Sequence, residues 1–162
     1  MNITRSEAIV FSSFFKMIDL EPERLIYLTD SALAEFGKSV KKEEQKNKYL
    51  RKYIEIKFSS YRNEYFKIFL HRYIDRDIEI LGAEPELFKC PCCEYKTLEK
   101  FSEYFICPVC FWEDDGTNSD DKYSTANRML LGDAKRNFLT FKAIDEKSLA
   151  FLDEDRFLQF GK

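Results

Sequence analysis

The chain has 162 residues, of which 44% are hydrophobic, and its 26 Lys and Arg against 29 Asp and Glu give a formal net charge of −3. This length and composition suit one globular domain or two small domains that share an interface. No run approaches the roughly 18 apolar residues of a membrane-spanning helix, and charged residues stand where a signal peptide would be apolar. We therefore expect a soluble cytoplasmic protein, neither membrane-spanning nor secreted.

The N-terminal residues predict two helices. Thr4 and Glu7 have the spacing of a capping box ahead of an apolar run, which predicts a helix over about 5–18. Pro22 suits the first turn of a second helix, expected over 22–36. Both segments carry many large apolar side chains, so the helices should pack on each other or on later segments of the chain.

The segment from 41 to 81 fits two interpretations. We favour an exposed, charged helix that ends at the Ser59–Ser60 break, followed by a long helix over 61–81 with apolar residues at helical spacing. The rival is a hairpin that pairs 53–58 with 65–70, and periodicity alone does not exclude it.

A change of composition at Gly82–Pro85 marks a domain boundary. All five cysteines and the only tryptophan lie beyond it. We predict a helical region over 1–83 and a zinc-organised region over 84–162, with no long linker between them. The expected fold is α+β, in which the N-terminal helical region packs on a small zinc-ribbon-like region that has one or two following helices.

The cysteines occur in two short motifs, CPCC at 90–93 and CPVC at 107–110, with thirteen residues between Cys93 and Cys107. A C-x2-C…C-x2-C pattern can surround one tetrahedral ion, and clustered thiols in a reducing compartment favour a metal over disulfides. We predict one structural zinc ion. Its ligands would be Cys90, Cys93, Cys107 and Cys110. Cys92 is the alternative ligand, a spare thiol or a reactive one.

Rival chemistries for this cluster are a redox dithiol, an iron–sulfur cluster and a catalytic zinc. A redox pair is expected singly at the start of a helix in a βαβ context, and no such pattern is present. A catalytic zinc keeps an open position, which four cysteines leave no room for. An enzyme using Cys92 or Cys93 as a nucleophile would lack an activating histidine, because His71 is the only one and lies outside the cluster. We expect no enzymatic activity.

The residues around the cysteines predict short elements. The runs 95–98 and 104–106 are β-prone and indicate a hairpin that links the two cysteine turns. A helix is expected over 124–141, beginning at Ser124 or Thr125, and a short helix over 145–152. The last apolar residues, including Phe157 and Phe160, should dock back on the body.

These motifs resemble the bacterial cysteine-rich CPCC family. The resemblance rests on the CPCCEYKTL block at 90–98 and the YFICPVCFWEDD block at 104–115, and it continues more loosely to about 146 through Asn127 and an AKRNF segment at 134–138. The sequence departs from the family at Glu94, where a glycine is usual, and at Gly132–Asp133. The resemblance implies a small zinc-binding protein, and some members have a setting similar to that of immunity proteins paired with toxins.

Our leading hypothesis is a non-enzymatic, zinc-stabilised protein-binding module, an immunity protein that neutralises a basic toxin domain such as a nuclease. The acidic residues after the second motif would contact that partner and speed association. They are Glu113, Asp114, Asp115, Asp120 and Asp121. The alternative is a nucleic-acid-binding or regulatory zinc ribbon, which the basic stretch at 38–57 favours and the sequence pI of about 5.4 opposes.

Overall fold

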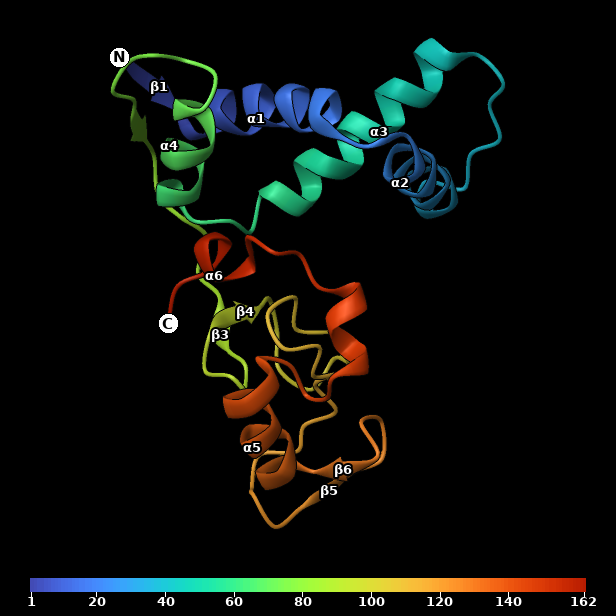
Figure 1. Ribbon diagram of the computed structural model, residues 1–162, viewed down its shortest axis with the longest axis vertical. Helices are drawn as coiled ribbons and strands as arrows, with labels where there is room; N and C mark the ends of the chain where they lie inside the picture. The colour runs from blue at the N-terminus through green and yellow to red at the C-terminus, as the bar shows by residue number, and fades with distance from the viewer. The chain divides into compact units, whose positions relative to one another are not determined.

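The chain, described over all 162 residues by a computed structural model, divides into two compact units, Met1–Glu84 and Pro85–Lys162. The first unit consists mainly of helices, and the second holds small strand pairs and a few short helices (Figure 1). The protein is therefore α+β, as predicted, and the cysteines lie together in the small C-terminal unit. No helix is both long and apolar enough to cross a membrane.

The first two helices form where the sequence predicted them, as α1 (Arg5–Asp19) and α2 (Pro22–Glu35). The Thr4 hydroxyl accepts a hydrogen bond from the Glu7 amide, and the Glu7 carboxylate accepts one from the Thr4 amide at 2.7 Å. This reciprocal pair is a complete capping box, which satisfies amide groups that the first turn leaves free.

The next two helices, α3 (Glu43–Phe58) and α4 (Asn63–His71), make the rival hairpin interpretation of this segment wrong. Together they form most of the core of the N-terminal unit, in which aromatic rings meet edge to face. The ring of Phe58 lies 5.9 Å from that of Phe66, for example. Such pairs add to the stabilisation that burial of their apolar area provides. The buried core residues of α3 and α4 are Leu50, Ile54, Phe58, Tyr65, Phe66, Phe69 and Leu70.

The predicted long helix over 61–81 is wrong, because α4 ends at His71. The chain instead forms strand β2 (Glu79–Leu81), which pairs in parallel with β1 (Asn2–Thr4) at the start of the chain. Residues with alternating burial, Ile78 and Ile80, turn their side chains into the unit. The helical spacing of apolar residues thus continues by coincidence into a strand whose partner is more than seventy residues away.

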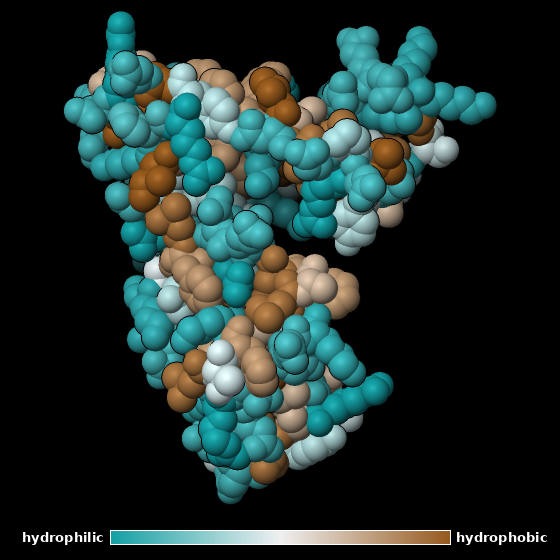
Figure 2. All heavy atoms as spheres, viewed as in Figure 1, coloured by the Kyte–Doolittle hydropathy of each residue, from teal (hydrophilic) through white to brown (hydrophobic).

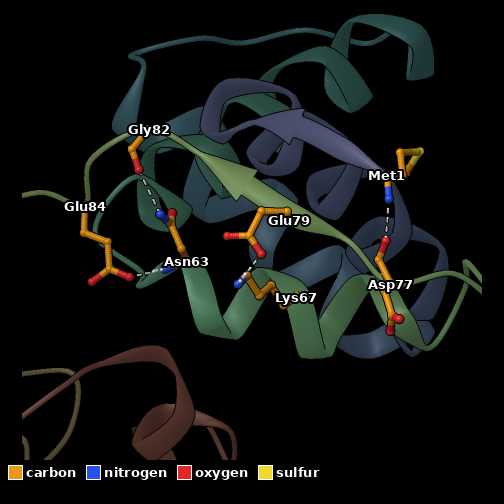
Figure 3. Close-up of polar contacts among 7 residues, drawn as sticks. All are labelled: Met1, Asn63, Lys67, Asp77, Glu79, Gly82 and Glu84. Atoms are coloured by element: carbon orange, nitrogen blue, oxygen red, sulfur yellow. Dashed lines mark hydrogen bonds and ion pairs between the residues drawn. The ribbon is translucent and has the colours of Figure 1, made fainter.

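Polar contacts hold this strand pair in place (Figure 3). The N-terminal amine of Met1 donates to the carbonyl of Asp77 at 2.6 Å, and Lys67 of α4 forms an ion pair of 3.0 Å with Glu79 of β2. The Asn63 side chain donates to the carbonyl of Gly82 at 2.9 Å. The end of the N-terminal unit is therefore fixed against the start of α4.

In the C-terminal unit, each cysteine motif lies between its own pair of strand segments. Strand β3 (Phe88–Lys89) pairs antiparallel with β4 (Lys96–Leu98) around the first motif. Ile106 and Glu113 form an antiparallel bridge around the second. The prediction that 95–98 and 104–106 form one hairpin is therefore wrong, because each segment pairs across its own cysteine turn.

The predicted helix over 124–141 begins later than expected, as α5 (Leu131–Phe141). The residues before it form a small hairpin of β5 (Tyr123–Ser124) and β6 (Met129–Leu130). Arg128 has φ of 55° in the turn of this hairpin, a left-handed conformation that a continuous α-helix does not contain.

The last residues close over the cysteine unit, as the sequence predicted. A 3-10 turn, η1 (Lys147–Phe151), and a short helix, α6 (Arg156–Gln159), precede the terminus. Phe160 is buried, and the ring of Phe157 lies 5.7 Å from that of Tyr95. The Lys96 amide of β4 donates to the carbonyl of Gly161 at 2.8 Å, so the terminal segment adds to the edge of the β3–β4 pair.

Candidate metal centre

The two cysteine motifs fold into matching turns, or knuckles. In the first, the amide of Cys90 donates to the carbonyl of Tyr95 at 2.8 Å, and the amide of Glu94 donates to the carbonyl of Cys90 at 2.9 Å. In the second, the amide of Cys107 donates to the carbonyl of Trp112, and the amide of Phe111 donates to the carbonyl of Cys107, both at 2.8 Å. Each turn therefore presents its first and fourth side chains together, which is the arrangement that two ligands to one ion require.

The four predicted ligands meet in the interior of the unit. Their sulfur atoms all lie within 4.8 Å of one another, with Cys90 Sγ 3.6 Å from Cys110 Sγ and Cys93 Sγ 3.6 Å from Cys107 Sγ. A tetrahedron of sulfurs about 2.3 Å from a central ion has edges of about 3.8 Å. The sulfurs are also too far apart for disulfides, whose S–S distance is about 2.0 Å. The four cysteines therefore fit a tetrahedral metal ion.

The buried thiols of the cluster shift one another's pKa values in opposite directions. Burial alone would raise the pKa of Cys107, but the hydrogen bonds that its sulfur accepts from Cys110 and Cys90 outweigh burial and hold this pKa well below its usual value. The hydrogen bond with Cys107 raises the pKa of Cys90, and burial together with the neighbouring thiols raises the pKa of Cys110. Four thiolates so close together repel one another, so a bound cation is what allows all four to ionise.

Two further side chains border the cluster. The hydroxyl of Thr97, on β4, lies 3.2 Å from Cys107 Sγ and can donate a hydrogen bond to its thiolate. Hydrogen bonds of this kind orient metal ligands and support their charge. Cys92 is buried but does not belong to the group of four, and His71 is an exposed residue at the end of α4 in the other unit.

The acidic residues predicted to contact a partner divide into two groups. Asp114 is only 2% exposed, and its carboxylate accepts a hydrogen bond from the Ser102 amide at 2.8 Å. Asp115 accepts hydrogen bonds from the Ser124 hydroxyl at 2.7 Å and the Thr117 amide at 3.1 Å. These two carboxylates hold the loop together, with Asp114 buried and Asp115 half-buried, and contact of either one with a partner stays a prediction.

The other three acidic residues differ in their exposure. Glu113 is half-buried, and its backbone is clamped by the side chain of Asn127 through two hydrogen bonds of 2.8 Å. Asp120 and Asp121 are exposed; Asp120 forms an ion pair of 2.7 Å with Lys135, and Asp121 accepts a hydrogen bond from Ser119. Of the five predicted acidic contact residues, Asp120 and Asp121 are the exposed members.

Comparison with known protein families identifies the region that contains these features. Residues 88–156 match the family described as cysteine-rich CPCC. The match confirms the resemblance seen in the sequence, and it extends beyond the second knuckle through α5 to the first residue of α6. Comparisons with curated proteins and with solved structures gave no match.

The CPCC region shows a physical reason for one of its departures from the family. Gly132 stands near the start of α5, where a Cβ atom would lie 2.9 Å from the carbonyl oxygen of Asp120. The Gly132 amide also donates to that carbonyl at 3.0 Å. The glycine therefore allows the backbone at Asp120 to approach α5 more closely than a residue with a Cβ atom would allow.

The second departure in the CPCC region gives a testable prediction. Glu94 has φ of 65°, the left-handed conformation in which glycine is usual, and Phe111 has the same conformation in the second knuckle. A non-glycine residue there carries a strain of about 1–2 kcal/mol. Glycine would relieve this strain, but its greater conformational freedom in the unfolded state offsets part of the gain. We expect Glu94→Gly to raise the free energy of unfolding by about 0.5–1 kcal/mol, and Glu94→Val to lower it, in thermal unfolding of the metal-loaded protein. Equal stability of both variants would contradict this account of the turn.

Sequence reasoning did not identify several residues of the site. The sequence predicts Thr97 only as part of a β-prone run, does not distinguish Ser102 from other loop residues, and places Ser124 at the start of a helix. Their roles depend on which segments fold next to each other. Asn127 was the exception, because the resemblance to the family included it.

Proposed function

We propose that the protein is a non-enzymatic protein-binding module whose C-terminal unit is stabilised by one zinc ion. Four buried thiolates in a tetrahedral arrangement are a donor set that zinc favours. Such a set fills every coordination position, so it leaves no place for a substrate or a reactive water molecule. The metal centre would then act in folding, and function would lie in the surfaces that the two units present.

The observation that carries this proposal is the surface of α1. Several of its large apolar side chains face solvent, with Phe14 47% and Ile18 75% exposed, whereas its fully buried positions hold only Ala8, Ser12 and Ser13. Phe11 and Val10 are also exposed on this helix. A helix normally buries its large apolar side and exposes its small and polar residues. Exposed apolar patches of this kind mark sites of protein–protein interaction.

Exposed apolar side chains also occur on α2 of the same N-terminal unit. Ile26 and Tyr27 of α2 are more than half exposed. Apolar atoms reach the surface over these helices in the space-filling view (Figure 2). The guanidinium of Arg51, on α3, lies 4.9 Å from the centre of the Phe14 ring and places a charge beside this exposed ring. An apolar centre with polar surroundings is the usual composition of a protein interface.

As the specific role, we propose a cytoplasmic immunity protein that binds and neutralises a bacterial toxin domain. The resemblance of the CPCC region to proteins in such a setting supports this role. The exposed carboxylates of Asp120 and Asp121 would also attract a basic toxin domain, because opposite charges speed the association of two proteins. The C-terminal unit, with fifteen acidic and eleven basic residues between 85 and 162, offers nucleic acid little electrostatic attraction.

The test uses co-expression with the product of a toxin gene adjacent to the gene for this chain. We expect protection of the cells and a complex that survives purification. Replacing Phe11 and Ile18 together with Gln should weaken binding by more than about tenfold, because central apolar contacts dominate interfaces. The double variant should leave the free energy of unfolding within about 1 kcal/mol of the parent, because surface substitutions have small effects.

The matched control is Leu139→Gln, which changes a residue that is 73% exposed on α5 in the other unit. This variant should bind as the parent does. If co-expression gives neither protection nor a complex, the toxin-neutralising role is wrong. If a complex forms but both variants bind equally well, the α1 surface is not the binding site.

A further inference from the structure

Arg156 is the one basic residue among the buried residues of the protein. Its side chain is 8% exposed, and its guanidinium lies 4.5 Å from the ring of Phe157. Burying a charge costs several kcal/mol unless another charge balances it. The position of this residue therefore calls for a nearby anionic group.

One hydrogen bond of Arg156 joins it to the backbone of the second cysteine turn. Its Nε donates to the carbonyl oxygen of Val109 at 3.1 Å, in a buried contact, and its Nη1 donates to the carbonyl oxygen of Asp153 at 2.8 Å. Val109 stands between the two ligands of the second knuckle, Cys107 and Cys110. Both acceptors are neutral carbonyls, so neither of them balances the positive charge.

The cysteine cluster, whose second turn holds the Val109 carbonyl, would carry negative charge when a metal ion is bound. Four thiolates around a divalent ion carry a net charge of −2, which is itself costly in a buried position. The Thr97 hydroxyl supports one thiolate, but it is uncharged. A guanidinium fixed on the backbone of the second knuckle would offset part of this charge, and attraction between charges is strong where water is excluded.

We propose that Arg156 is the counter-charge of the metal–thiolate centre. It stabilises the metal-loaded cluster electrostatically, and the loaded cluster in turn stabilises the burial of Arg156 and of α6. Because such coupling is reciprocal, metal binding and docking of the C-terminal segment strengthen each other. This role depends on the proposed metal centre, but not on the identity of any protein partner.

The test compares variants of the full chain by competition for zinc with a chromogenic chelator. Arg156→Gln keeps hydrogen-bond donors for the Val109 carbonyl but removes the charge, and we expect zinc affinity to fall by about 10–100-fold, as for other groups that support metal ligands. Arg156→Lys keeps the charge and should stay within about threefold of the parent. The control Lys147→Gln changes the net charge equally at an exposed residue and should leave affinity unchanged.

Rescue by lysine separates the charge from a purely structural role. If Arg156→Gln binds zinc as tightly as the parent, or if Arg156→Lys loses as much affinity as Arg156→Gln, the counter-charge role is wrong. If Arg156→Gln does not fold, the affinity of Arg156→Lys decides alone: near-parental affinity supports the role, and a loss of tenfold or more overturns it. A parent that binds no zinc at all would instead overturn the proposed metal centre.

Discussion

Removal of zinc with a strong chelator is expected to unfold the C-terminal unit and to expose Trp112. This residue is the only tryptophan of the chain, it is fully buried, and its carbonyl accepts the hydrogen bond from Cys107 that closes the second knuckle. Structural zinc contributes about 10–16 kcal/mol of apparent binding free energy in small zinc-dependent units, more than most domains have in total stability. Trp112 emission should shift to longer wavelength as zinc leaves and return when zinc is restored.

A matched pair of cysteine variants sharpens this prediction. Cys107→Ser removes one of the four clustered ligands and should purify with little zinc and with the emission of an exposed tryptophan. Cys92→Ser changes a buried cysteine outside that group and should keep one zinc ion per chain. If Cys92→Ser loses zinc and Cys107→Ser does not, the assignment of the ligands is wrong.

Phe66→Ala is expected to lower the free energy of unfolding of the N-terminal unit by about 3–5 kcal/mol, because it removes a large, fully buried ring. The ring contacts Phe58 and Tyr65, and the Arg5 guanidinium lies 5.5 Å from its centre. Helical ellipticity at 222 nm should be lost at a lower denaturant concentration than in the parent. The measurement is equilibrium unfolding followed by circular dichroism.

The control for this variant is Ile68→Ala, on the same helix but 39% exposed, which should cost less than about 1 kcal/mol. Because every ligand lies in the C-terminal unit, Phe66→Ala should still bind one zinc ion and keep Trp112 buried under native conditions. Loss of zinc from Phe66→Ala, or equal destabilisation by both variants, would contradict the proposed core and the division of the chain into two units.

Local features of the sequence predicted the elements that local interactions define. The capping box at Thr4 and the proline at the start of α2 fixed the beginnings of the first two helices. The spacing of the cysteines likewise identified four side chains that the structure brings within 4.8 Å of one another. In each case, the residues that determine the feature are neighbours in the sequence or ligands for one centre.

Features that depend on distant segments were not predictable in this way. Strand β2 forms because β1 lies beside it. The spacing of apolar residues over 61–81 contains no sign of that partner strand. Ser124 was expected to begin a helix, but its hydroxyl donates to Asp115 instead and helps to hold a hairpin turn. The exposure of the apolar side of α1 and the burial of Arg156 likewise depend on packing among elements that are far apart in the sequence.

X-ray absorption spectroscopy at the zinc edge tests the central claim most directly. On the purified protein, we predict one zinc ion per chain with four sulfur neighbours at about 2.3 Å, and the same spectrum for Cys92→Ser. A shell containing nitrogen or oxygen at about 2.0–2.1 Å, or fewer than four sulfur neighbours, would show an open site and contradict a purely structural role for the metal.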